Sequence, residues 1–147
     1  MPDSLNNQTA LRADNLSFAY RDRPIVRDFS LTLVPGDLTV LLGPNGSGKS
    51  TILQLLAGRL VPQNGDVLLD GVALRKLSGT QRASKIAVVP QAAPPVFGFT
   101  VHERVAIGRR ARLSPFTKFT EEDEHDIVEA MRIFDVERLA EIGRAHV

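Results

Sequence analysis

The chain of 147 residues contains no cysteine and no tryptophan, and it has a single tyrosine. Disulfide bonds and thiolate metal sites are therefore excluded, and a reducing compartment such as the cytosol is a natural location. No apolar run approaches the length of about 20 residues that a membrane-spanning helix requires. The formal net charge of +1 gives no electrostatic reason to expect nucleic acid as a partner. The composition is otherwise ordinary for a soluble protein, and the length suits one domain with a hydrophobic core.

One segment fits the phosphate-binding loop pattern G-x-x-x-x-G-K-[ST] at every position. Glycines let the backbone curl so that successive N–H groups point inward at an anion. Lys49 supplies a mobile ammonium for the β- and γ-phosphates, and the Ser50 hydroxyl is the expected ligand of a phosphate-bound Mg²⁺. The predicted nucleotide-binding residues of this loop are Gly43, Pro44, Asn45, Gly46, Ser47, Gly48, Lys49, Ser50 and Thr51.

The residues on either side of the loop favour a strand before it and a helix after it. Leu38–Leu42 is a short apolar run typical of a buried strand. Residues 50–59 predict a helix that packs through Ile52, Leu53, Leu55 and Leu56. The start of that helix would lie under the phosphates, where its dipole and free N–H groups favour negative charge. The alternative, an accidental glycine-rich turn, does not explain this strand–loop–helix context.

The rest of the chain predicts antiparallel-type strands first and helices last. Alternation of apolar and polar residues indicates strands at 11–20 and 26–34, and shorter strands are expected at 66–70, after a turn at 62–65, and at 86–89. A short polar helix is expected at 78–85, a second helix starts at Thr100, and Thr120 with Asp123 forms a capping box for a last helix with the stripe Ile127, Val128, Met131 and Phe134. Residues 1–10 read as a disordered tail. The fold class is therefore α/β with added β and helical parts.

Two motifs that flank the loop indicate a family. Leu16-Ser17-Phe18-Ala19-Tyr20 before the loop and Val88-Val89-Pro90-Gln91 after it resemble the nucleotide-binding domain of an ATP-binding cassette (ABC) transporter. The resemblance covers residues 11–140 and implies a P-loop NTPase core with an N-terminal antiparallel β subdomain and the start of a helical subdomain near residue 99, an incomplete domain. Residues 70–91 and 99–109 are similar to the ATPases of iron-chelate, haem and cobalamin importers.

The resemblance implies roles for individual residues. Tyr20 would stack on adenine, the alternative being an ordinary edge-strand aromatic. Gln91 would approach Mg²⁺ and the attacking water and link the nucleotide to the membrane subunit, the alternative being a polar loop residue. Lys49 and Gln91 would thus serve catalysis, and Ser50 and Gln91 the metal. The implied partners are ATP, a transmembrane permease and a second copy of the ATPase, with the protein peripheral on the cytoplasmic face of the inner membrane.

Several family elements are missing from the sequence. It has no LSGGQ-type signature after Gln91, no second strand that ends in Asp-Glu, and no switch histidine. Leu77–Gln81 imitates the signature but precedes Gln91, so Ser78 is better interpreted as a helix N-cap. His102, His125 and His146 have no spacing for a metal and receive no role. The polypeptide is therefore expected to bind nucleotide poorly or moderately and to hydrolyse little of it.

Other features leave alternatives open. The basic residues Arg104, Arg109, Arg110, Arg112 and Lys118 precede the acidic stretch 121–126, which is either a solvated surface or a docking face for the membrane subunit. A soluble ABC ATPase of DNA repair or translation, and a small P-loop kinase, are the rival functions. The solute is not encoded in this chain, because selectivity lies in the permease and its binding protein.

The last seven residues, Glu141–Val147, match one reading frame of a widely used short-read sequencing adapter that is followed by a stop codon. This match predicts a gene cut near Ala140 and a non-native tail at 141–147, the alternative being a genuine short protein with a polar tail. A non-native tail has no reason to pack and is expected to form an unanchored terminus.

Overall fold

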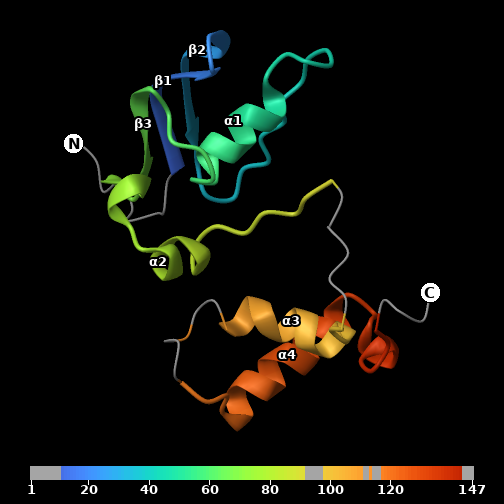
Figure 1. Cartoon of the computed structure of the whole chain (residues 1–147). Helices are drawn as coiled ribbons and strands as arrows, with labels where there is room; N and C mark the ends of the chain where they lie inside the picture. Colours follow the sequence, from blue (N-terminus) through green and yellow to red (C-terminus); the bar gives the residue numbers. More distant parts are fainter. Residues whose placement is uncertain (1–10, 92–97, 111–112, 114–116, 144–147) are drawn as a thin grey trace. The chain divides into compact units, whose positions relative to one another are not determined.

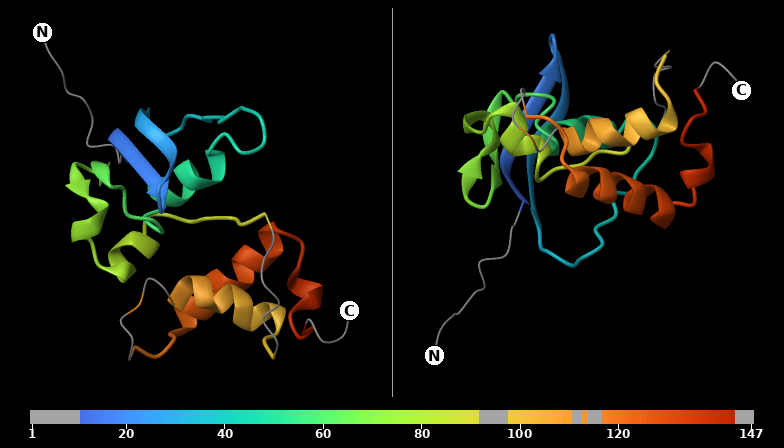
Figure 2. Two further views of the ribbon diagram at one scale, coloured as in Figure 1. Left: turned by 45° about the horizontal axis from the view of Figure 1, so that its top comes forward. Right: turned by 90° about the horizontal axis from the view of Figure 1, so that it is seen from below.

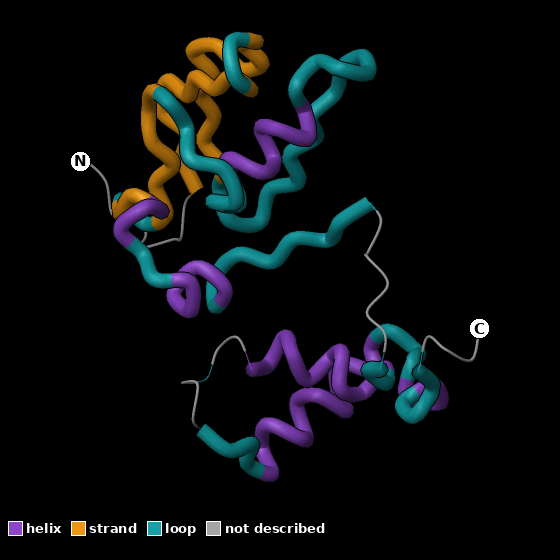
Figure 3. The backbone as a smooth tube through the Cα atoms, viewed as in Figure 1, coloured by secondary structure: helices purple, strands orange, loops and turns teal. Residues whose placement is uncertain are grey.

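Antiparallel strands dominate the first of the two units into which the chain divides, Met1–Ser78 and Gly79–Val147. The computed structural model describes residues 11–91, 98–110, 113 and 117–143. The sheet of the first unit has the strand order β2-β1-β3-β4, and all of its pairs are antiparallel (Figures 1 and 3). Its strands are β1 (Leu11–Tyr20), β2 (Arg23–Leu33), β3 (Asn64–Leu69) and β4 (Val72–Ala73).

The core of the first unit lies between this sheet and helix α1 (Lys49–Leu56), which runs beside the strands in Figures 1 and 2. Alternation along β1 and β3 turns one set of side chains inward, and the i, i+3, i+4 spacing of α1 supplies the opposite face. Leu16 and Leu55 are almost completely buried. The other buried hydrophobic residues of the unit are Ala13, Val26, Ile52, Leu56, Val67, Leu69, Ala73 and Leu74. The predicted strand 11–20 is confirmed, and the strand and helix predicted at 26–34 and 50–59 are present with other bounds, Arg23–Leu33 and Lys49–Leu56. Leu53, predicted to pack, is 57% exposed, so its part of the prediction is wrong.

A bulge in β1 meets a glycine in β3. Asp14 pairs with Asp66 and Ser17 with Asn64, so two β1 residues, Asn15 and Leu16, face the single residue Gly65. The turn expected at residues 62–65 is therefore wrong in its second half, because β3 already begins at Asn64. The backbone carbonyls of Asp14 and Asn15 occupy the space in which a Cβ of Gly65 would stand. Only glycine fits at this point of the sheet.

Two expected strands do not form. Leu38–Leu42 and Ile86–Val89 belong to no strand and have no strand partner among the described residues. Leu38, Leu42 and Val89 are 92%, 85% and 95% exposed. The apolar composition that indicated buried strands is real, but a strand also needs neighbours to satisfy its N–H and C=O groups. No residue that the structure describes provides those neighbours.

The second unit is helical. It contains α2 (Gly79–Ala83), α3 (Val101–Arg110), α4 (Glu121–Ile133) and a 3₁₀ turn at Glu137–Leu139, and α3 and α4 lie side by side (Figures 1 and 2). The Thr120 hydroxyl accepts from the Asp123 N–H, and the Asp123 carboxylate accepts from the Thr120 N–H, which confirms the predicted capping box. Ile127 and Met131 are buried as expected, whereas Phe134 of the predicted stripe is 77% exposed. No helix in the described ranges is long and apolar enough to cross a membrane.

Part of the expected non-native tail contacts α3. The Ile142 carbonyl accepts a hydrogen bond from the Val101 N–H at 3.2 Å, and Gly143 forms an isolated bridge with Thr100. The expectation of an unanchored terminus therefore does not hold for these residues. Residues 144–147 lie outside the described part of the chain, as does the expected tail at 1–10. The proposed domain boundaries stay a prediction.

Candidate nucleotide-binding site

The phosphate-loop pattern forms a tight loop that ends in the first turn of α1. Gly46 and Gly48 have φ of 80° and 90°, which is left-handed backbone that other residues rarely adopt. The Ser47 N–H donates to the Pro44 carbonyl at 3.3 Å, and the Ile52 N–H donates to the Gly48 carbonyl at 2.9 Å. The first bond curls the loop and the second begins the helix. The chain reversal that the glycines predict is therefore in place.

The Lys49 side chain folds back over this loop. Its ammonium donates to the carbonyls of Gly43 and Pro44 at 2.7 and 2.6 Å and lies 3.4 Å from the Ser47 hydroxyl. None of the ion pairs between described residues includes Lys49. A full positive charge is thus held at the mouth of the loop by neutral groups, two carbonyls and a hydroxyl. An anion would satisfy it better than they do.

The start of α1 is also open to an anion. The N-cap residue Gly48 provides no side-chain hydrogen bond, and the first turn contains no acidic residue. The start of α4 is different, because Thr120 caps it and four acidic residues, Glu121–Glu124, follow. A helix start leaves backbone N–H groups without intrahelical partners. In α4 the chain satisfies those groups itself, whereas in α1 it leaves them to an external group such as a phosphate.

Ser50, the predicted Mg²⁺ ligand, stays a prediction, and its position is compatible with that role. It lies in the first turn of α1 and is exposed, next to Lys49. The described residues contain no group of three or more His, Cys, Asp or Glu side chains that could hold a metal ion by themselves. Mg²⁺ is commonly held by few protein ligands together with phosphate oxygens and water. The residues present therefore fit Mg²⁺ that arrives with a nucleotide.

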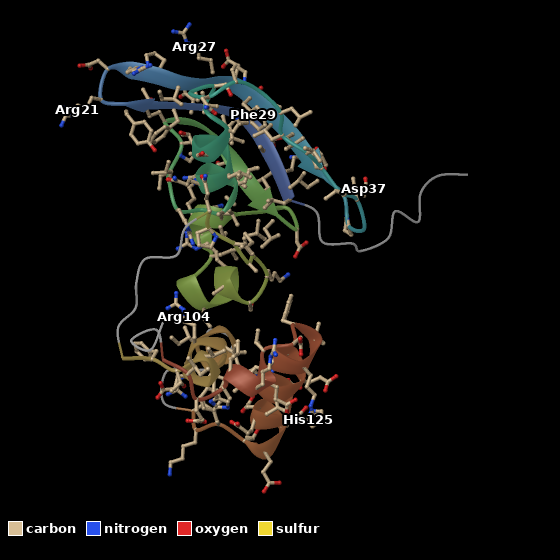
Figure 4. The ribbon with its side chains drawn as sticks, turned by 90° about the vertical axis from the view of Figure 1, so that its right-hand side faces the viewer. Arg21, Arg27, Phe29, Asp37, Arg104 and His125 are labelled. Atoms are coloured by element: carbon tan, nitrogen blue, oxygen red, sulfur yellow. The ribbon has the colours of Figure 1, made fainter. Side chains whose placement is uncertain are left out.

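Tyr20 lies at the end of the β1–β2 hairpin, where Figure 4 labels Arg21 in the turn. It pairs with Arg23, and two residues further along β2 Ile25 contacts Gly48 of the phosphate loop. The Tyr20 ring is 48% exposed and packs edge-to-face on Phe18, with ring centroids 4.9 Å apart. This end of the hairpin is thus the end beside the loop, and the Tyr20 ring keeps accessible surface for stacking. Its contact with adenine stays a prediction.

Gln91 is exposed and directly precedes residues 92–97, which are outside the described part of the chain. It belongs to the second unit, while the phosphate loop and Tyr20 belong to the first. The structure brings the loop residues and the Tyr20 hairpin together. The role of Gln91 toward Mg²⁺ and water stays a prediction.

In the second unit, much of the charged stretch pairs with itself. Arg109 contacts Asp123 at 2.6 Å and Asp126 at 2.8 Å, and the Arg110 guanidinium lies over the Phe119 ring, 5.4 Å from its centroid. The Thr120 N–H, followed by the Arg109 side chain, holds the pKa of Asp123 below its usual value. His102, which received no role from the sequence analysis, has its Nε2 atom 2.6 Å from the Glu124 carboxylate. From the sequence alone, this stretch is interpreted either as a solvated surface or as a docking face. The contacts between α3 and α4 were not predicted, because the sequence of neither helix indicates which element it packs against.

A glycine loop, an open helix start and a lysine that forms no ion pair with any described residue define a P-loop nucleotide-binding protein. Comparison with known proteins narrows the class. Residues 26–142 match the family model described as ABC transporter, and the chain belongs to that family. The small P-loop kinase is thereby excluded.

Individual relatives agree with this assignment. The chain is 42% identical over 137 residues to the hemin import ATP-binding protein HmuV of Pseudomonas fluorescens (strain Pf0-1), with 93% of this chain and 51% of that protein covered. It is 38% identical over 118 residues to the iron(3+)-hydroxamate import ATP-binding protein FhuC of Bacillus subtilis (strain 168), with 80% and 44% covered. A solved ATP-binding subunit of an ABC transporter superposes with a TM-score of 0.79 at 25% identity, with 95% and 56% covered. The chain thus spans about half the length of the curated relatives it matches.

Proposed function

We propose that the chain is the nucleotide-binding part of an ABC ATPase subunit that powers import of a metal chelate, haem or cobalamin through a membrane permease. The observation that carries the proposal is the Lys49 ammonium, held by carbonyls at the uncapped start of α1. The importer class is supported by the names of the relatives, which are ATP-binding proteins for hemin and iron(3+)-hydroxamate import. The rival soluble ATPase of DNA repair or translation has no comparable support.

The described residues divide the work of binding. Backbone N–H groups of the loop and of the α1 start surround the phosphates, and Lys49 exchanges its carbonyl partners for phosphate oxygens. Tyr20 would stack on adenine from the hairpin. Ser50, with Gln91, would hold Mg²⁺, which when bound neutralises phosphate charge. A second copy, the permease and a peripheral position on the cytoplasmic face of the membrane belong to the same proposal.

The proposal is tested by titrating the polypeptide with a fluorescent ATP analogue in the presence of Mg²⁺. We expect saturable binding that excess ATP reverses and that excess adenosine does not, because the phosphates supply most of the contacts. Binding that ATP fails to displace would contradict the assignment.

Replacement of Tyr20 with alanine is expected to weaken ATP and GTP by a similar factor, at a cost of about 1–3 kcal/mol. Stacking uses the ring face and does not read the hydrogen-bonding edge of the base. The measurement is the affinity for both nucleotides, with Tyr20→Phe as the control that keeps the ring. A lowered melting temperature with unchanged affinity would show that Tyr20 serves only the packing on Phe18.

The polypeptide of these 147 residues is expected to show no meaningful ATP turnover, even when concentrated. Hydrolysis requires a positioned water and charge stabilisation, and the sequence contains neither a signature after Gln91 nor an Asp-Glu strand. Phosphate release is measured beside a Lys49→Ala preparation, which reports contaminating ATPases. Turnover well above that control would refute the expectation.

A further inference from the structure

Ile25 of β2 lies beside Gly48 of the phosphate loop. An ideal Cβ on Gly48 would lie 3.1 Å from the Ile25 carbonyl oxygen and 3.2 Å from its Cγ2 methyl group. Such separations are closer than ordinary van der Waals contact. The β2 backbone and this one methyl group therefore occupy the side of Gly48 on which any other residue would carry a side chain.

Gly48 joins the phosphate loop to helix α1. It is the N-cap of α1, its carbonyl accepts the Ile52 N–H at 2.9 Å, and Lys49 follows it. Gly48 is half-buried, whereas residues 43–47 are exposed. Apart from its chain neighbours and the helix backbone, the three atoms nearest to the position of a Gly48 Cβ all belong to Ile25. The loop is thus supported from outside at the residue that joins it to the helix.

Ile25 is itself well fixed. The next residue, Val26, is 4% exposed and pairs with Phe18 of β1, so the strand cannot move away from the loop without disturbing the core. Tyr20 lies five residues earlier, on the same hairpin. The same rigid element therefore bears the aromatic ring predicted to hold the base and the methyl group that supports the loop.

We propose that Ile25 is a positioning residue that fixes the phosphate loop, through its contact with Gly48, in the geometry that binds nucleotide phosphates. The inference rests on the proposed function and extends it from the loop to β2. Ile25 acts on the phosphates through Gly48 and does not read the base. Its effect should therefore be independent of whether a base is present.

The test compares Ile25→Val with Ile25→Leu in the whole polypeptide. Valine keeps a methyl group branched at Cβ, whereas leucine keeps the size of isoleucine but has no branch at Cβ. Isothermal titration calorimetry measures Mg²⁺-ATP and tripolyphosphate, which has phosphates and no base. We expect Ile25→Val to match the parent, and Ile25→Leu to bind both probes roughly three- to tenfold more weakly, about 1 kcal/mol. Tyr20→Ala should weaken ATP alone.

Each other outcome decides against the inference. Equal tripolyphosphate affinity in the valine and leucine variants would overturn it, and a loss for ATP alone would place Ile25 at the base. A loss that both variants share with a lowered melting temperature would assign Ile25 to packing only. If the parent binds neither probe, the proposed function itself fails and the inference fails with it. If the parent binds both and only the leucine variant weakens both, both proposals stand.

Discussion

Replacement of Lys49 with alanine is expected to abolish binding of a fluorescent ATP analogue while the melting temperature changes little. The Lys49 ammonium is the charged group over the loop, and its present partners are the exposed carbonyls of Gly43 and Pro44. Water replaces the lysine at those carbonyls with little loss, so the fold keeps its stability. The phosphates lose charge-assisted hydrogen bonds of about 1.5–3 kcal/mol each, enough to take the affinity below detection.

A matched control is Lys76→Ala, which removes the same charge from an exposed position in the 3₁₀ turn Leu74–Lys76 of the same unit. It should bind the analogue as the parent does. Affinity that survives in Lys49→Ala would remove the basis of the phosphate-loop assignment. Equal losses in both variants would show that net charge, rather than the position of the ammonium, governs binding.

Replacement of Gly65 with alanine is expected to produce the largest loss of stability. A Cβ at this position would lie 2.1 Å from the Asp14 carbonyl oxygen and 2.5 Å from that of Asn15, and Gly65 has φ of 80°. Backbone atoms held by two strand pairings cannot move aside as a side-chain end would. We expect a cost of about 3–5 kcal/mol from the collision and the backbone strain together, which is large beside a typical total stability of about 5–15 kcal/mol.

The control for backbone strain is Gly71→Ala. Gly71 has φ of 76°, and nothing lies within 4 Å of its Cβ position. Gly71→Ala is therefore destabilised by backbone strain but not by a collision. Urea denaturation followed by far-UV circular dichroism measures both variants. Gly65→Ala should unfold at a far lower urea concentration than Gly71→Ala. Equal midpoint concentrations would show that β1 and β3 shift at the bulge and make room for the added Cβ.

The sequence predicted the parts of the fold whose causes are local. The loop at residues 43–51, the helix after it and the Thr120–Asp123 capping box each follow from residue types within a few positions. The bulge at Asn15 did not follow, because it involves partners from other strands: Gly65 of β3 lies opposite it, and the Ser30 hydroxyl of β2 accepts from the Asn15 N–H at 2.9 Å. Such pairings join residues far apart in the chain, and no local pattern announces them.

The site residues also divide into those that a local motif predicts and those that depend on contacts between distant parts of the chain. The glycines, Lys49 and Ser50 were found because they form one continuous motif, and the structure brings them together. The Ile25 contact with Gly48 had no signal in the sequence, since a branched residue in a strand is ordinary. The proximity of Ile25 to Gly48 depends on where the fold places β2 relative to the start of α1.

The extended segment Leu38–Leu42 has a consequence for handling the polypeptide. Leu38 and Leu42 face solvent, and so do Val88 and Val89 of the segment Ile86–Val89. An uncovered apolar strand is a template for edge-to-edge pairing with another chain, and short β-prone runs without charge nucleate aggregates. We therefore expect solutions of this 147-residue polypeptide to aggregate increasingly as its concentration is raised.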